Sequence, residues 1–200
     1  KYPDNEDAIS GIKRLNPNSL FRSDLDELKE LFRLKKFREV EVKCGVYLER
    51  YPEVQELHSM LGSVLGLKGA HADALQHFKK AAEINPLYAN VQFNLGNAFR
   101  QNGDNELALK SFKQAINLEP KHVPALSNAG MIFMADKKYD DALEYFRAAA
   151  TLMPNSVEVL CNVARTLKEK GEYDIAIAHY QRAIELDGRN AQVFLDLAMC

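Results

Sequence analysis

Cysteine is scarce in this chain, and its distribution excludes two classes of site. The 200 residues include three cysteines, Cys44, Cys161 and Cys200. Their number is odd, and they are scattered without the short spacing of metal ligands or the density of a disulfide framework. Thiols of this kind are typical of a reducing compartment, so we expect a cytoplasmic protein with reduced cysteines.

An excess of one charge and long hydrophobic runs are also missing. The formal net charge is −2, which offers no basic face to nucleic acid. No segment approaches the roughly 18 consecutive apolar residues of a membrane-spanning helix, and residues 1–4 lack the apolar core of a signal peptide. We therefore expect neither nucleic acid nor a membrane among the partners.

Sequence signatures of catalysis are absent as well. There is no Gly-rich phosphate loop and no nucleophile elbow, and the five histidines share no metal-ligand spacing. His77 and His179 are expected to face solvent. Arg165 could lower the pKa of Cys161 on the adjacent turn, although a plain thiol is the simpler interpretation. We expect no enzyme activity in this segment, no metal and no cofactor.

What the sequence does contain is a repeat of 34 residues. Small residues recur at this spacing at Gly62, Gly96, Gly130, Ala164 and Ala198. The same period relates Ala74, Ala108, Ala142 and Ala176; Phe78, Phe112, Phe146 and Tyr180; Ala81, Ala115, Ala149 and Ala183; and Pro52, Pro86, Pro120, Pro154 and Gly188. Self-similarity at a fixed period is the signature of a repeat architecture, in which each added unit extends one core.

Each repeat contains two predicted helices. Between residues 89 and 121, apolar residues recur three and four apart in two segments, which the polar residues 101–104 separate,. Gly103, like Gly69 and Gly171, stands where a helix can end in a left-handed residue at little cost. The proline column ends the second helix. No segment has the period-two alternation of a strand, so we predict an all-α fold in which small and large residues interdigitate.

These columns resemble the tetratricopeptide repeat over nearly the whole chain. The family's Leu-Gly/Ala step appears as Leu61-Gly62, Leu95-Gly96, Ala129-Gly130, Val163-Ala164 and Leu197-Ala198. The resemblance implies a right-handed α-solenoid superhelix of antiparallel helix pairs, whose first helices line a concave groove. Repeats are expected at residues 21–54 (a divergent copy), 55–88, 89–122, 123–156 and 157–190. Residues 1–20 would hold the end of a preceding repeat and a helix near residues 7–15, and residues 191–200 the first helix of a truncated repeat.

Three asparagines precede the small-residue column by two positions, at Asn94, Asn128 and Asn162. In this family that position faces the groove. An amide can bond both the N–H and the C=O of a peptide, and helices about 8–10 Å apart would meet an extended chain about every third residue. The arrangement is similar to the asparagine ladder of O-linked N-acetylglucosamine transferase. The alternative is that duplication copied a harmless surface asparagine.

The other expected groove residues are more varied. Phe93, Met131 and Met134 would accept ligand side chains, since methionine adapts to different partners. Asn97 is the remaining polar member. Three cations, Arg100, Arg165 and Lys168, would favour acidic residues in the ligand.

The sequence therefore predicts a scaffold that binds an extended peptide or a partner helix in its groove. Two alternatives stay open. The segment could be the substrate-presenting arm of a larger transferase, because sulfotransferase- and glycosyltransferase-type proteins carry similar arrays. The apolar residues Phe194 and Leu197 of the last helix could also pair between two copies of the chain.

Overall fold

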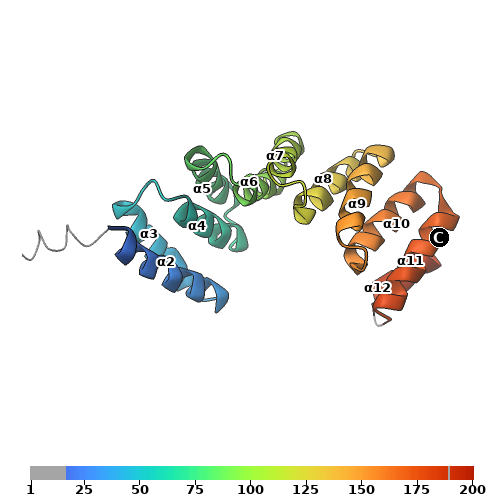
Figure 1. Cartoon of the computed structure of the whole chain (residues 1–200), viewed down its shortest axis with the longest axis horizontal. Coiled ribbons are helices and arrows are strands. Elements are labelled where there is room, and N and C mark those ends of the chain that lie inside the picture. Colours follow the sequence, from blue (N-terminus) through green and yellow to red (C-terminus); the bar gives the residue numbers. More distant parts are fainter. Residues whose placement is uncertain (1–16, 189) are drawn as a thin grey trace, which may run out of the picture. The chain divides into compact units, whose positions relative to one another are not determined.

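The computed structural model describes residues 17–188 and 190–200, and these contain helices and no strand. The helix predicted near residues 7–15 lies outside this part. Figure 1 shows eleven helices in the described residues. They are α2 (Pro17–Arg33), α3 (Phe37–Arg50), α4 (Gln55–Leu67), α5 (His71–Ile84), α6 (Ala89–Gln101), α7 (Asn105–Leu118), α8 (Val123–Ala135), α9 (Tyr139–Leu152), α10 (Val157–Lys170), α11 (Tyr173–Leu186) and α12 (Ala191–Ala198).

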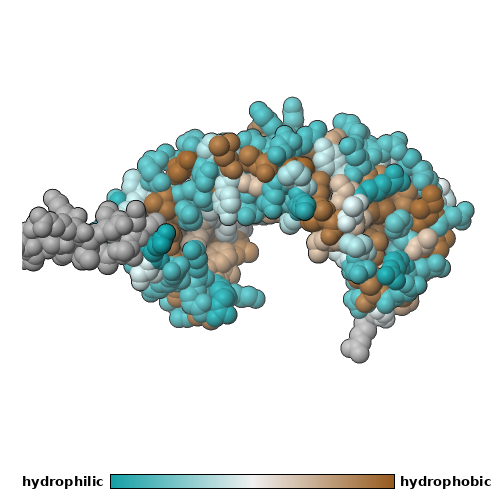
Figure 2. All heavy atoms as spheres, in the orientation of Figure 1, coloured by the Kyte–Doolittle hydropathy of each residue, from teal (hydrophilic) through white to brown (hydrophobic). Residues whose placement is uncertain are grey.

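The helices form two compact units that divide between Ile84 and Asn85. The first unit holds the pairs α2/α3 and α4/α5, and the second holds α6/α7, α8/α9, α10/α11 and the single helix α12. Each pair packs against the next within its unit, so the predicted all-α solenoid is confirmed. On the face drawn in Figure 2, hydrophilic residues dominate the surface of each unit. None of the described helices combines the length and apolarity that crossing a bilayer requires.

The first repeat begins earlier than the sequence predicts. Helix α2 starts at Pro17, so the expected boundary between residues 20 and 21 falls inside this helix. Proline is favoured in the first turn, where its missing N–H leaves no helical bond unmade. The first helix of this pair has 17 residues and that of the next has 13. The 34-residue period alone therefore does not locate the start of α2.

The turn inside each pair uses one left-handed residue. Positive φ angles occur at five positions spaced by 34 residues: Lys35, Gly69, Gly103, Lys137 and Gly171. At Lys137 the N–H donates to the carbonyl of Met134, and the next N–H donates to that of Phe133. This is the Schellman arrangement, and it satisfies carbonyl groups that the helix end would leave unpaired. Glycine was expected at three of these positions; lysine adopts the same conformation at the other two.

Replacing Lys137 by glycine should stabilise the second unit. A left-handed conformation costs an L-residue about 1–2 kcal/mol, and part of this gain is offset by the greater freedom of glycine in the unfolded chain. We expect Lys137→Gly to raise the free energy of unfolding by about 0.5–1 kcal/mol, measured by urea denaturation. The reciprocal variant Gly103→Lys should lower it by a similar amount, and a gain in both variants would contradict this explanation.

The glycine and aromatic columns meet inside each pair. A Cβ atom built on Gly96 would lie 2.6 Å from the ring of Phe112, and one on Gly130 would lie 2.8 Å from Phe146. Both rings are fully buried. The glycines are therefore required because the aromatic ring occupies the space of a side chain.

His77 does not face solvent as the sequence analysis expected. Its Nδ1 atom lies 3.0 Å from Nδ1 of His58, and Nε2 of His58 lies 2.9 Å from the carbonyl oxygen of Pro52. Because a carbonyl only accepts, neutral His58 carries its proton on Nε2 and accepts from the Nδ1–H of His77. Burial, followed by the nearby His58, lowers the pKa of His77. The error arose because a position on a second helix still contacts the first helix of its own pair.

Mild acid should destabilise the protein through two half-buried histidines, His77 and His179. Burial also lowers the pKa of His179, with Arg147 as a second cause. A lowered folded-state pKa means that the unfolded chain binds the proton more readily. The stability is then complete above the ordinary histidine pKa of about 6.5 and is lost as the pH falls through the folded value. Thermal unfolding should show this decrease, and His77→Gln should reduce it; an unchanged pH dependence would contradict the assignment.

Candidate functional site

The predicted groove residues lie on the first helices of three consecutive pairs in the second unit. Helix α6 carries four of them, and α8 and α10 carry three each. Eight are half-buried, Arg100 is exposed, and Asn162 is buried. The structure thus brings residues far apart in the sequence onto neighbouring helices, because α6/α7 packs on α8/α9 and α8/α9 on α10/α11.

Asn128 is bonded within the protein. Its Nδ2 atom donates to Oδ1 of Asn97 at 2.7 Å, which joins α8 to α6. The two residues are 31 positions apart. Asn97, on the first helix of one repeat, therefore bonds Asn128 on the first helix of the next. This bond leaves the Asn128 side chain with fewer groups for a ligand.

Asn162 lies in the same column, but its surroundings differ. The residue is 6% exposed, although the sequence analysis treated it as a surface position. Its Nδ2 atom is buried and has no hydrogen-bond partner within the described residues. The residue 31 positions earlier is Met131, which stands where Asn97 stands one repeat before. A thioether is at best a weak acceptor, so the internal bond of Asn128 has no counterpart here.

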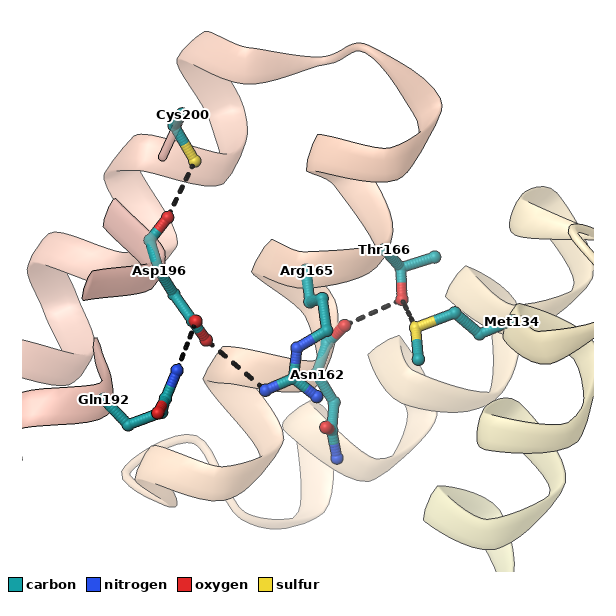
Figure 3. A network of polar contacts seen from close by, with 7 residues as sticks. All are labelled: Met134, Asn162, Arg165, Thr166, Gln192, Asp196 and Cys200. Atoms are coloured by element: carbon teal, nitrogen blue, oxygen red, sulfur yellow. Dashed lines mark hydrogen bonds and ion pairs between the residues drawn. The ribbon is translucent and has the colours of Figure 1, made fainter. Parts of the chain in front are cut away.

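The next two residues related by this 31-residue spacing form an ion pair. A guanidinium nitrogen of Arg165 on α10 lies 3.4 Å from Oδ2 of Asp196 on α12, again 31 positions apart. Gln192 donates to the other oxygen of Asp196 at 2.8 Å. Figure 3 shows these side chains converging between the two helices. Sequence reasoning missed this pair, although a cation and a carboxylate 31 residues apart were visible in the repeat alignment.

Phe93 and Met134 take part in packing between repeats. The ring of Phe93 lies 4.9 Å from that of His122 and 5.9 Å from that of Phe112, centroid to centroid. The Met134 sulfur lies 3.5 Å from the hydroxyl of Thr166, which also donates to the backbone carbonyl of Asn162 at 2.7 Å (Figure 3). Each side chain is half-buried, so only part of it is open to a ligand.

His122 is a functional-site neighbour that the sequence analysis did not identify. It is 7% exposed, and its Nδ1 atom accepts from the backbone N–H of Ala125 at the start of α8. The other nitrogen, Nε2, therefore carries the proton and donates to Oδ1 of Asn90 at 3.1 Å,. His122 thus caps α8 and links it to α6, which fixes the spacing of the groove helices.

A pocket of about 480 Å³ opens between α10 and α12. Seven of its ten lining residues have polar side chains, and two of the ten belong to the loop before α12. The lining residues are Val157, Glu158, Cys161, Asn162, Arg165, Asp187, Asn190, Gln192, Val193 and Asp196. Asn162, with its unpaired amide, and the Arg165–Asp196 pair thus line the same cavity.

Cys161 is not activated by this environment. Burial raises the pKa of its thiol, and the opposing effect of Arg165 is smaller. A thiol with a raised pKa is a poor nucleophile at neutral pH, which agrees with the plain-thiol interpretation. In the part of the chain that the structure describes, no three acidic, histidine or cysteine side chains are placed to hold a metal ion.

Tyr180 supplies a second buried group without a partner. Its side chain is fully buried, its hydroxyl has no hydrogen-bond partner in the described residues, and burial raises its pKa to about 12. Phenylalanine occupies the three equivalent positions. We expect Tyr180→Phe to raise the free energy of unfolding by about 1 kcal/mol. Phenylalanine has no hydroxyl, so folding no longer pays the cost of removing that group from water without a hydrogen-bond partner. Chemical denaturation measures this, and a loss of stability would reveal a bonded hydroxyl.

The last helix presents an apolar surface that is only partly covered. Phe194 is 46% exposed. Leu197, the other residue proposed to pair between copies, packs against the core of the α10/α11 pair. Self-association through this end stays a prediction and now concerns Phe194 rather than Leu197.

Comparison with known families agrees with the repeat architecture. Family profiles described as tetratricopeptide repeat match residues 53–120 and 93–157, and one described as TPR repeat matches residues 164–199. The chain belongs to the tetratricopeptide-repeat (TPR) family. TPR arrays are protein-interaction scaffolds, generally without catalytic activity. A comparison with curated protein sequences finds no match.

Solved TPR structures share the fold at low sequence identity. The Pseudomonas aeruginosa pilF structure is 22% identical with a TM-score of 0.78, covering 88% of this chain and 80% of its own. YrrB, described as a TPR protein with an unusual peptide-binding site, is 19% identical with a TM-score of 0.73, covering 88% and 91%. A MamA structure is also 19% identical, with a TM-score of 0.73 and coverage of 86% and 93%. These likenesses establish the fold of the present chain and leave its ligand open.

Proposed function

We propose that the second unit is a protein-interaction scaffold that binds an extended peptide segment of a partner along α6, α8 and α10. One observation carries the proposal: Asn94, Asn128 and Asn162 lie at one position on three consecutive first helices, flanked by half-buried Phe93 and Met131. This combination of amides and adaptable apolar side chains suits a ligand with exposed backbone groups. The peptide-binding site named for YrrB gives the proposal a precedent within the fold.

The geometry favours an extended ligand. Packed helices lie about 8–10 Å apart, and an extended chain advances about 3.3 Å per residue. Successive asparagines would then meet the backbone about every third residue. Backbone bonds supply affinity that depends little on sequence, while the flanking pockets select side chains.

Affinity capture from a cell lysate tests this function. The variant Asn94→Ala/Asn128→Ala removes two groove amides at half-buried positions. Its matched control, Gln114→Ala/Asn117→Ala, removes two exposed amides from the second helix α7. We expect quantitative mass spectrometry to show a defined set of proteins lost with the groove variant and retained with the control. Circular dichroism verifies folding, and equal capture by the two variants would refute binding in the groove.

A further inference from the structure

Asn162 differs from Asn128 because no group in the described residues accepts its amide hydrogens. The bond from Asn128 to Asn97 measures 2.7 Å, whereas Nδ2 of Asn162 is buried and unpaired. A buried amide group without a partner costs about 1–3 kcal/mol. The presence of Met131 in place of an acceptor thus leaves an amide that gains a hydrogen bond whenever a ligand supplies one.

The Asn162 side chain can offer this bond without breaking another. It lines the pocket between α10 and α12. Its Nδ2 atom has no partner in the described residues, and the hydroxyl of Thr166 bonds the backbone carbonyl of Asn162 rather than its side chain. Rotation about its Cβ–Cγ bond turns the amide toward the pocket without loss of an internal bond, and this torsion is broad in asparagine. Asn128 would first have to give up its bond to Asn97.

The charges of the pocket favour a cationic ligand. Its lining contains three carboxylates, from Glu158, Asp187 and Asp196, and one cation, Arg165. Arg189 lies between two of these lining residues in the sequence, and the carboxylates still outnumber the cations when its charge is included. Arg165 is already paired with Asp196. The preference for acidic ligands predicted from Arg165 therefore does not follow at this pocket.

We propose that the pocket between α10 and α12 is a specificity site for an extended peptide with a lysine or arginine side chain. The peptide backbone bonds the amide of Asn162, and the basic side chain points toward Glu158. Glu158 is four residues before Asn162 and therefore lies on the same face of α10. This inference rests on the proposed peptide-binding function and adds the class of ligand and its position.

Selection from a phage-displayed library of random dodecapeptides against the whole chain provides the test. We expect enrichment of peptides with a lysine or arginine at one position. The affinity of a fluorescein-labelled selected peptide is then measured by fluorescence anisotropy for Met131→Asn and Met131→Ala. Both variants remove the methionine, but only asparagine offers Asn162 the internal acceptor that Asn97 gives Asn128. Met131→Asn should therefore bind about fivefold more weakly than Met131→Ala, the effect of about one hydrogen bond.

Glu158→Gln tests the contribution of the Glu158 charge separately from that of the Asn162 amide. It should weaken binding about two- to fivefold, as for a partly exposed ion pair, and reduce the salt dependence of the affinity. Equal affinity of the two Met131 variants, or selected peptides without a basic residue, would overturn the proposal. If the peptides are instead lost with Asn94→Ala/Asn128→Ala alone, the groove function stands and the pocket proposal fails. If no peptide is enriched, both fail.

Discussion

Phe146→Ala should lower the free energy of unfolding of the second unit by about 3–5 kcal/mol. The ring of Phe146 is fully buried in the cluster that joins the α8/α9 and α10/α11 pairs, with Leu143 and Leu160 among its members. Alanine loses the transfer free energy of the ring and leaves a cavity that the surrounding helices only partly fill. The loss should spread to neighbouring repeats, since a helix pair is stable mainly through its contacts with the next.

Urea denaturation followed by circular dichroism measures this effect. Ile175→Ala on α11 is the matched control, because its side chain is 49% exposed and should contribute much less. We expect the control to cost about 1 kcal/mol or less. If Phe146→Ala cost no more than the control, the aromatic column would not form the core that stabilises the pairs.

Gly96→Ala should destabilise the protein although it replaces glycine inside a helix. Alanine gains about 1 kcal/mol from its helix propensity. The added Cβ atom, however, would lie 2.6 Å from the fully buried ring of Phe112. Overpacking of this kind costs about 1–3 kcal/mol. We therefore expect a net loss of up to about 2 kcal/mol in the free energy of unfolding.

Gly45→Ala isolates the steric effect. Gly45 is exposed within α3, and a Cβ atom there would meet nothing within 4 Å. This variant should be stabilised by about 1 kcal/mol through helix propensity alone. Phe112→Leu should relieve part of the penalty of Gly96→Ala in a double-mutant cycle. Additive effects of these two changes would show that the ring and the glycine do not compete for space.

Much of the fold follows from spacing in the sequence. The 34-residue period places the helix pairs, and Gly69, Gly103 and Gly171 mark turns that the structure makes with left-handed residues. Local pattern could not identify the same turn at Lys35 and Lys137, since lysine has no preference for that conformation. The early start of α2 could not be predicted for a related reason. The end of a helix depends on its own residues rather than on the repeat period.

The site was less predictable because it depends on contacts between repeats. The sequence indicates that Asn94, Asn128 and Asn162 share a column, and nothing in that column distinguishes them. The difference arises 31 residues earlier, where Asn97 bonds Asn128 and Met131 leaves Asn162 unpaired. The contact of His58 with His77 likewise joins two helices. Periodicity within one helix contains no information about either pairing.

The 31-residue register also limits how such a protein can be rearranged by duplication or by design. Residues 97 and 128, or 165 and 196, belong to adjacent repeats and bond each other. A repeat moved to another place in the array would keep its fold but acquire a new neighbour on each side. The groove asparagine of that repeat could then gain or lose its hydrogen bond to the neighbouring repeat without any change in its own sequence. Under the proposed function, the ligand preference would depend on the junctions between repeats, and a chimera has to be cut within a repeat to preserve a junction.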